Sequence, residues 1–210
     1  MSQPGGPDVR DQWNSRFSAQ EYVYGTKPND FLAESASSLP PAPARVLSLG
    51  EGEGRNAVFL ATLGHRVTAV DASEVGLGKA EKLAAERGVS LKTVVSDLAD
   101  FTLTPDTWDV VVSIFCHLPM PLRRQVHRAV VASLRPGGMV VLEGYTPAQL
   151  ALRTGGPPKR EWLYTAEELR EDFQGLDFLV LRELERDVVE GKLHTGRGAV
   201  VQVLARKPTR

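Results

Sequence analysis

The stretch LSLGEGEGRNA, residues 47–57, brings three glycines together directly after an apolar run. Glycine lacks a Cβ, so a turn built from it can be tight and lets a ligand approach the backbone closely. In a sheet of parallel strands, ligands bind beyond the carboxyl ends of the strands, where the first strand-to-helix turn lies. We therefore predict a ligand-binding turn after the first strand. It consists of Gly50, Glu51, Gly52, Glu53 and Gly54.

Outward from this turn, apolar runs alternate with amphipathic stretches, and the connections between them are short. Such alternation predicts an α/β fold of three layers, in which helices cover both faces of a mostly parallel, Rossmann-like sheet. The predicted strands span residues 45–49, 66–70, 91–96, 109–115 and 139–143, and the predicted helices span 55–63, 73–87 and 121–134.

The C-terminal part departs from this alternation. It predicts a helix over 165–173 and two strands, over 178–184 and 199–205. Residues 191–198, between these strands, have the character of a hairpin loop. Because a short hairpin joins antiparallel strands, we expect the last strand to run antiparallel to its neighbours.

The chain length of 210 residues suits one substantial core, so we predict a single domain over 11–210. Within it, residues 11–44 form a helical lid that ends in the stiff spacer PPAPA, residues 40–44. The first ten residues are rich in proline and glycine, and we predict a disordered tail over 1–10.

Charge and cysteine content exclude several classes of protein. A net charge of -1 and a pI of about 6.4 provide no basic surface for nucleic acid. The single cysteine, Cys116, makes no internal disulfide and no cysteine-cluster metal site. The sequence has neither a secretory signal at its start nor an apolar run of the roughly 18 residues that span a membrane. We expect a cytoplasmic protein without a metal, a nucleic-acid partner or a membrane contact.

The spacing of the glycine turn distinguishes between nucleotides. A dinucleotide fold requires glycine at the first, third and sixth positions, whereas the sixth position counted from Gly50 is Arg55. The two glutamates of the turn would repel a pyrophosphate but tolerate a sulfonium and an ammonium group. S-adenosylmethionine carries both cations and no phosphate, so the turn favours it. An NAD(P)-dependent oxidoreductase and a non-catalytic nucleotide-binding module on the same fold stay open as alternatives.

Two carboxylates follow later strands at the same edge of the predicted sheet. Asp71 follows the second strand, 21 positions after Gly50, where it can accept hydrogen bonds from both ribose hydroxyls. Asp97 follows the third strand, with Leu98 beside it, where it can accept from an adenine amino group. Their places strengthen the prediction of a nucleoside site.

Five stretches resemble the successive motifs of class I S-adenosylmethionine-dependent methyltransferases. They are VLSLGEGEGRNA, VTAVDAS, SDLADF, WDVVVSIFCHLP and LRPGG. The front segment WNSRFSAQEYVYGTKPNDFL and the later segment GYTPAQLALRTGGPPKREWLYTAEELREDF resemble the tellurite-resistance (TehB-like) and small-thiol methyltransferase branch. The resemblance covers nearly the whole chain, from about Trp13 to Lys207.

This resemblance implies a seven-stranded sheet with the last strand inserted antiparallel. It implies that the glycine turn holds the methionine part, Asp71 the ribose, and Asp97 with Leu98 the adenine. We add Ala72 and Phe115, which lie within the matching motifs, to the cofactor-binding residues. In one departure, many members carry an acid where Ser48 stands, and Glu51 is a candidate to replace it.

The front segment is the natural lid of such a site. Trp13, Tyr22 and Tyr24 can close over a sulfonium through cation–π contacts of about 0.5–2 kcal/mol, or they can simply pack the segment onto the sheet. We predict that Tyr22 binds the cofactor and that Tyr24 takes part in catalysis. His117 directly follows the fourth strand, where it can orient or deprotonate an acceptor, or merely precede a helix.

Three further residues bear on the acceptor. Tyr145 ends the fifth strand, and Arg153 begins the glycine- and proline-rich stretch 153–158, so we predict that both contact the acceptor. His194 lies in the predicted hairpin loop near basic residues, where we expect a solvated turn rather than a ligand contact.

Methyl transfer needs an aligned nucleophile and a dry site, and it needs a general base only when the acceptor arrives protonated. We therefore predict an S-adenosylmethionine-dependent methyltransferase acting on a small molecule. The expected acceptor is a soft nucleophile, either a thiol or a tellurite- or selenite-like oxyanion. We expect a monomer, with a dimer as the alternative.

Overall fold

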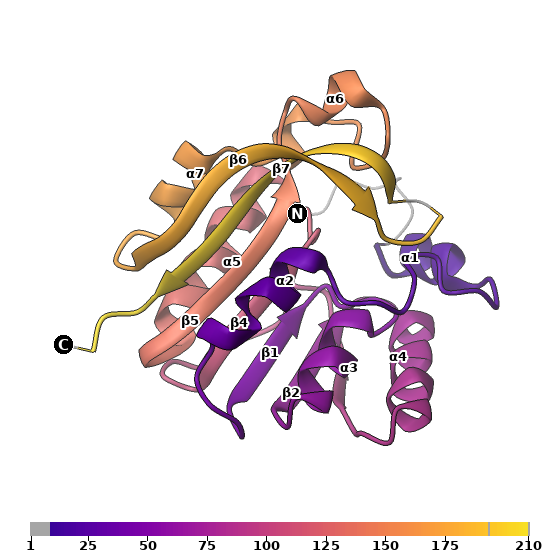
Figure 1. Ribbon diagram of the computed structural model, residues 1–210, viewed down its shortest axis with the longest axis horizontal. Coiled ribbons are helices and arrows are strands. Elements are labelled where there is room, and N and C mark those ends of the chain that lie inside the picture. The colour runs from indigo at the N-terminus through magenta and orange to yellow at the C-terminus, as the bar shows by residue number, and fades with distance from the viewer. Residues whose placement is uncertain (1–8, 193, 210) are drawn as a thin grey trace.

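The computed structural model describes residues 9–192 and 194–209, within which seven strands form one sheet (Figure 1). The strands lie in the order β3-β2-β1-β4-β5-β7-β6. Strand β7 is antiparallel to both of its neighbours, and all other neighbouring pairs are parallel. The predicted sheet with one antiparallel strand is confirmed. The strands are β1 (Arg45–Leu49), β2 (Arg66–Asp71), β3 (Lys92–Val95), β4 (Trp108–Ile114), β5 (Leu134–Tyr145), β6 (Asp177–Val189) and β7 (Thr195–Arg206).

Helices cover both faces of the sheet and complete the three predicted layers (Figure 1). Among the described residues, no helix combines the length and the apolar character needed to cross a membrane. The helices are α1 (Val9–Phe17), α2 (Asp30–Ser35), α3 (Arg55–Thr62), α4 (Glu74–Glu86), α5 (Met120–Ser133), α6 (Gln149–Leu152) and α7 (Ala166–Asp172), with short 3-10 turns η1 (Ala36–Ser38) and η2 (Arg160–Trp162).

The central strands are buried on both faces, as their valine-rich sequences predict. Val110 and Val112 of β4 pack in the cluster that holds α2, α3 and α4, whereas Val111 packs in the cluster that holds α5 and α7. All three side chains are 0% exposed. Successive side chains of a strand point to opposite faces, so one apolar run supplies both halves of the core.

Three strands are longer than the sequence predicts. Strand β6 continues to Val189 and β7 begins at Thr195, so half of the predicted loop 191–198 is strand. Strand β5 begins at Leu134 rather than at residue 139. Strand β5 ends at Tyr145, which pairs with Val200. Residues 195–199 of β7 therefore have β6 as their strand partner. This two-stranded extension is charged and rich in glycine, which hides its strand pattern in the sequence.

The front segment lies across the start of α4. The Ser73 hydroxyl donates to Asn14 Oδ1 (2.7 Å) and accepts from the Gly76 N–H (3.0 Å), so Ser73 is the N-cap of α4. Helix α1 begins at Val9, inside the segment for which we predict disorder, and the rest of that segment lies outside the described residues. Within the predicted lid, residues 11–44, the part around Asn14 thus docks on the start of α4.

Candidate active site

The turn after β1 has a left-handed backbone that glycine adopts without strain. The φ angle is +59° at Gly50 and +63° at Gly52. A Cβ on Gly50 would lie 2.6 Å from Cys116 Sγ, and a Cβ on Gly52 would lie 3.0 Å from the Phe17 ring. The two glycines therefore let the end of β4 and helix α1 close onto the turn while its backbone still faces a cavity.

Glu51 turns its carboxylate toward the start of α3. It accepts hydrogen bonds from the N–H groups of Asn56 (3.1 Å) and Ala57 (2.9 Å), and from the Ser48 hydroxyl. Burial raises the pKa of the Glu51 carboxyl group. Glu51 thus brings a carboxyl group to Ser48, the position at which the resemblance noted above implies an acid. It also fills the anion site that the N–H groups of a helix N-terminus offer.

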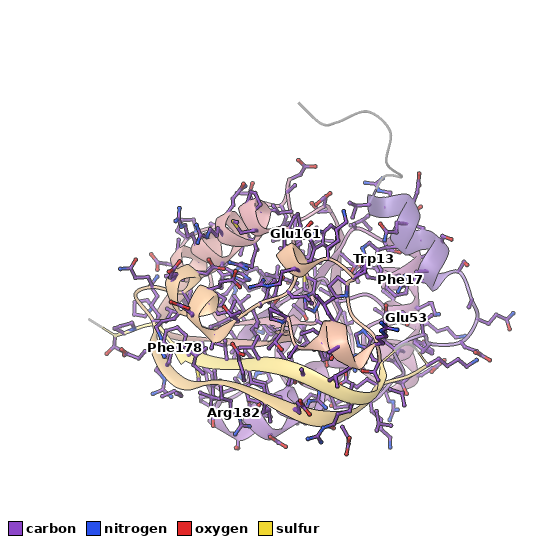
Figure 2. All side chains as sticks on the ribbon, turned by 90° about the horizontal axis from the view of Figure 1, so that it is seen from above. Trp13, Phe17, Glu53, Glu161, Phe178 and Arg182 are labelled. Atoms are coloured by element: carbon purple, nitrogen blue, oxygen red, sulfur yellow. The ribbon has the colours of Figure 1, made fainter. Side chains whose placement is uncertain are left out.

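Glu53 fastens the lid to the turn. Its carboxylate is 3% exposed, pairs with Lys79 Nζ and accepts from the Tyr24 N–H (3.2 Å). Figure 2 places Trp13 and Phe17 of α1 in the same region as Glu53. Because Lys79 neutralises Glu53, this side chain contributes less negative charge to the site than the sequence alone suggests.

Asp71, Asp97 and Leu98 line the cavity beside the turn. Asp71 accepts from the N–H groups of Gly52 and Ser73, both at 2.8 Å, and burial raises the pKa of its carboxyl group. Asp97 accepts from a backbone N–H through one oxygen only. A carboxylate oxygen can accept more than one hydrogen bond, so both residues keep capacity for hydroxyl and amino groups of a nucleoside.

The cavity has a volume of about 630 Å³, within the range of small-molecule sites. Aromatic rings follow one another along its wall. Trp13 stacks on Phe17 with centroids 5.5 Å apart, and Phe17 meets Tyr24 at 6.2 Å. His194 then lies 4.6 Å from Tyr24 and 4.8 Å from Phe115. We call these five residues the aromatic wall.

His117 lines the cavity, as predicted, but both of its ring nitrogens are engaged. Nδ1 lies 2.8 Å from the Trp162 carbonyl oxygen, and Nε2 accepts from the Tyr145 N–H (3.2 Å). Burial lowers the pKa of His117 to about 4, so the ring is neutral with Nδ1–H as donor. A ring in these bonds has no lone pair left for the proton of an acceptor, which favours a positioning role.

His194 is not the solvated loop residue that the sequence suggests. It belongs to the aromatic wall, and its Nδ1 is buried without a hydrogen-bond partner among residues 9–192 and 194–209. Burial, helped by the charge of Arg55, lowers its pKa to about 3, so the ring is neutral. His194 is buried because the tip of the β6–β7 hairpin lies close to the lid. No local sequence pattern reveals this contact.

The two predicted acceptor residues lie outside the lining of the cavity. Tyr145 is 1% exposed and packs behind Phe115 with centroids 4.6 Å apart. Arg153 ends α6 in a left-handed conformation (φ +56°) and is exposed. We predicted both residues as acceptor contacts because they lie at or after the end of β5. The chain turns after Tyr145, however, and residues 155–159 and Trp162 line the cavity instead.

Three predicted cofactor residues also lie outside this lining. The Tyr22 hydroxyl donates to the Lys79 carbonyl oxygen (3.1 Å), so its ring packs on α4. A Cβ on Gly54 would lie 2.6 Å from Ala80, so this glycine serves close packing of α3 on α4. Ala72 sits between Asp71 and the cap of α4. The remaining candidates, Gly50, Glu51, Gly52, Asp71, Asp97, Leu98, Phe115, His117 and Tyr24, all line the cavity.

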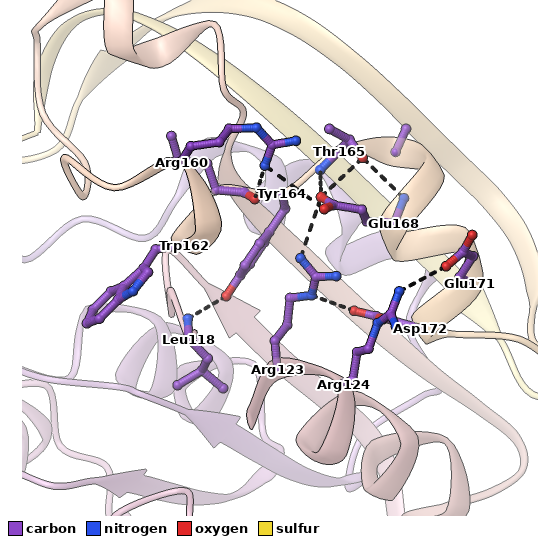
Figure 3. Close-up of polar contacts among 12 residues, drawn as sticks. Leu118, Arg123, Arg124, Arg160, Trp162, Tyr164, Thr165, Glu168, Glu171 and Asp172 are labelled. Carbon is purple, nitrogen blue, oxygen red and sulfur yellow. Dashed lines mark hydrogen bonds and ion pairs between the residues drawn. The ribbon is translucent and has the colours of Figure 1, made fainter. Parts of the chain in front are cut away.

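Tyr164 clamps the loop that follows β4. Its hydroxyl accepts from the Leu118 N–H at 2.7 Å (Figure 3) and donates to the Cys116 carbonyl oxygen, also at 2.7 Å. Arg123 lies over the Tyr164 ring at 5.3 Å. The clamp fixes Phe115, whose φ of +51° is strained for a bulky residue. The packing of Arg123 on Tyr164 therefore determines the position from which Phe115 faces the cavity.

Because the pKa of His117 falls to about 4 on folding, unfolded chains bind more protons than folded ones between about pH 4 and 6.5. The stability that this residue contributes is therefore lost as the pH falls through that window. We expect His117→Gln to reduce the pH dependence of the free energy of unfolding by about 1–2 kcal/mol between pH 6.5 and 4.5. Urea denaturation at both pH values measures it, and an unchanged pH dependence would contradict the buried neutral state.

Part of the chain is similar to known proteins. Residues 46–138 match the family described as Methyltransferase domain. A 2-heptyl-1-hydroxyquinolin-4(1H)-one methyltransferase of Mycobacteroides abscessus is 29% identical over 115 residues, which cover 53% of this chain and 51% of that protein. The tRNA 5-carboxymethoxyuridine methyltransferase of Escherichia coli is 26% identical over 219 residues, with 82% and 83% covered. The chain spans about half the length of several curated relatives that it matches.

The crystal structure of TehB from Haemophilus influenzae superposes with a TM-score of 0.70 and 19% identity, over 95% of this chain and 67% of that one. Residues 46–138 thus match a methyltransferase domain, and the chain has the fold of class I S-adenosylmethionine-dependent methyltransferases. The resemblance to TehB is confirmed at the level of the fold. S-adenosylmethionine is the cofactor of this class.

Proposed function

We propose that this protein transfers a methyl group from S-adenosylmethionine to a small molecule, and that the acceptor is a soft nucleophile, either a thiol or a tellurite- or selenite-like oxyanion. One observation carries the choice of cofactor. The Glu51 carboxylate occupies the N–H groups of Asn56 and Ala57 at the start of α3. A pyrophosphate would use such N–H groups in a dinucleotide fold, so their occupation disfavours NAD(P) and favours a nucleoside without phosphate.

The residues of the cavity fit this cofactor. The thin turn at Gly50 and Gly52 leaves backbone exposed for the methionine part. Asp71 and Asp97 offer acceptors for ribose hydroxyls and an adenine amino group, and Leu98 offers an apolar surface. When bound, S-adenosylmethionine supplies a methyl group on a positively charged sulfur, which is already activated for displacement.

The chain contributes position and exclusion of water. Trp13, Phe17 and Tyr24 bring aromatic faces from the lid to the turn, where cation–π contact with a sulfonium is worth about 0.5–2 kcal/mol. Both members of the Glu53–Lys79 ion pair hold the lid: Glu53 accepts from the Tyr24 N–H, and Lys79 donates to the backbone carbonyl oxygens of residues 19 and 21. A closed aromatic site keeps water from the reacting atoms and aligns the acceptor.

The site suits an acceptor that arrives ionised. His117 is neutral with both nitrogens engaged, and burial raises the pKa of Cys116 to about 12, so that this thiol stays protonated. Neither residue serves as a general base at neutral pH. Thiols and chalcogen oxyanions ionise readily near neutral pH, whereas amines and alcohols need a base.

A macromolecular acceptor is the less favoured option. One relative is named as a tRNA methyltransferase, and another as a hydroxyquinolone methyltransferase, so relationship leaves the acceptor open. The net charge of -1 provides no general attraction to a polyanion. We therefore propose a small acceptor and include transfer RNA in the test.

We expect purified protein with S-adenosylmethionine to methylate at least one of a set of thiols, tellurite and selenite, with S-adenosylhomocysteine formed in equal amount. Mass spectrometry of both products measures it. Asp71→Asn is the matched control, and we expect its affinity for S-adenosylhomocysteine to fall about tenfold or more, since a hydrogen bond to a charged group is worth about 1.5–3 kcal/mol. Methylation of transfer RNA alone, or cofactor binding without transfer to any acceptor, would contradict the proposed function.

A further inference from the structure

Sheet order divides the cavity into two halves. The glycine turn follows β1, and Asp71 and Asp97 follow β2 and β3, so the cofactor residues lie toward the β3 edge. Phe115 follows β4, Trp162 lies between β5 and β6, and His194 lies at the β6–β7 tip. These residues line the same cavity from the other side, where β4, β5, β7 and β6 lie. We call the part of the cavity that Phe115, Trp162 and His194 line the acceptor half.

Aromatic rings form the surface of the acceptor half. Phe115 and His194 meet edge to face with centroids 4.8 Å apart, and Tyr24 lies 4.6 Å from His194. Trp162 is half-buried, and Figure 3 shows its indole pointing away from the Arg123–Asp172 contact. Such rings contribute apolar faces and edges that favour another aromatic ring over an alkyl chain or a hydrated inorganic ion.

The same half is arranged for a negative charge. Lys159 lies over the Trp162 ring at 5.7 Å, and both residues line the cavity. His194 is a neutral ring whose buried Nδ1 has no hydrogen-bond partner within the described residues. Buried polar groups are almost always hydrogen-bonded in a working complex, so a bound group is the natural partner of His194.

We propose that the acceptor is an aromatic thiolate, with its ring against Trp162 and Phe115 and its sulfur at an N–H of His194. This inference rests on the proposed function and selects among its acceptors. The thiolate sulfur forms a new bond to the methyl carbon as the bond from that carbon to the sulfonium sulfur breaks. The electron pair of the broken bond stays on the departing sulfur, which becomes a neutral thioether, and no proton moves.

The test compares thiophenol with 2,2,2-trifluoroethanethiol, a non-aromatic thiol that also ionises near neutral pH, and with tellurite. We expect kcat/KM for thiophenol to exceed that of each of the others at least tenfold at pH 8. Binding is measured separately, by calorimetry of each thiol with protein saturated with S-adenosylhomocysteine. Equal or higher kcat/KM for the alkyl thiol or for tellurite would overturn the proposal.

Two variants test the named residues. We expect Trp162→Ala to raise the KM for thiophenol about tenfold more than the KM for trifluoroethanethiol, and Trp162→Phe to restore most of the difference. Trp108→Phe is the matched control, because Trp108 lies at the start of β4, far along the strand from the cavity. We expect it to change neither KM. Equal losses for both thiols in Trp162→Ala would show that this ring has only a structural part.

We expect His194→Ala to weaken binding of both thiolates about tenfold or more, and His194→Asn, which keeps a neutral N–H, to recover part of it. Affinity for S-adenosylhomocysteine should change less than twofold in both variants. Unchanged thiolate binding in His194→Ala would overturn the role of His194. Failure of the proposed function is distinguishable, because it leaves S-adenosylhomocysteine unbound or every thiol unmethylated, whereas failure of this inference leaves methylation without an aromatic preference.

Discussion

Replacing Asp172 by alanine is expected to lower the free energy of unfolding by about 3–5 kcal/mol, because it leaves a buried guanidinium without its carboxylate. Asp172 Oδ2 lies 2.7 Å from Arg123 Nε and 2.9 Å from His127 Nδ1, and the Asp172 and Arg123 side chains are each 1% exposed (Figure 3). Burial alone would raise the pKa of Asp172, but the groups of His127 and Arg123 outweigh it and lower this pKa. The carboxylate is therefore ionised in the folded protein at neutral pH.

The neighbouring pair of Glu171 and Arg124 provides a matched control. It lies one residue away at 3.1 Å, but its side chains are 63% and 43% exposed. Surface pairs of this kind contribute about 0–1 kcal/mol, so Glu171→Ala should change stability little. Urea denaturation of both variants at pH 7.5 makes the comparison. Similar losses in the two variants would contradict the importance of burial at Asp172.

The Asp172→Ala variant also connects stability to the site. Arg123 and His127 both pack against Tyr164, whose hydroxyl holds the loop of Cys116 and Leu118. Loosening this support should let Phe115 leave its strained conformation. We therefore expect the folded variant to bind acceptors less tightly than the parent, while the glycine turn keeps its affinity for S-adenosylhomocysteine.

Replacing Gly50 by alanine is expected to lower the free energy of unfolding by about 2–4 kcal/mol and to weaken S-adenosylhomocysteine at least tenfold. The φ of +59° strains any other residue, and the new Cβ would lie 2.6 Å from Cys116 Sγ. Relief of the contact must move either the turn or the end of β4, and both line the cavity. Calorimetry and urea denaturation measure the two effects.

Two variants separate the causes. Gly78 of α4 has nothing within 4 Å of its Cβ position, so Gly78→Ala should raise stability by about 0.5–1 kcal/mol and leave binding unchanged. Combining Gly50→Ala with Cys116→Ala removes the sulfur but keeps the backbone strain. We expect this double variant to recover part of the loss. Full binding by Gly50→Ala alone would contradict a tightly enclosed turn.

Local patterns predicted the layers of the fold and half of the site. The valine run of β4 and the cap at Ser73 act through neighbouring residues only, so the sequence expresses them directly. The same holds for Asp71 and Asp97, whose places follow from the ends of their strands. Residues that follow parallel strands meet at one edge, which made the cofactor half predictable.

The acceptor half depends on contacts between distant segments. His194 reaches the cavity because the β6–β7 tip docks on the lid, where the Lys192 N–H donates to the Val23 carbonyl oxygen (3.0 Å). Tyr145 was predicted from its strand end, yet Trp162 faces the cavity in its place. The glutamates of the turn were predicted to face a cation, whereas Glu51 and Glu53 bind protein groups first. Periodicity carries no information about such long-range docking.

The Glu51 carboxylate accepts from N–H groups at the N-terminus of α3, and we propose that the cavity therefore has a site for S-adenosylmethionine and none for a dinucleotide. Calorimetric titration of the protein with S-adenosylhomocysteine and with NADH tests it most directly. We expect saturable binding of S-adenosylhomocysteine that weakens in Asp71→Asn, and no binding of NADH under the same conditions. Binding of NADH as tight as that of S-adenosylhomocysteine, or no binding of S-adenosylhomocysteine, would contradict the claim.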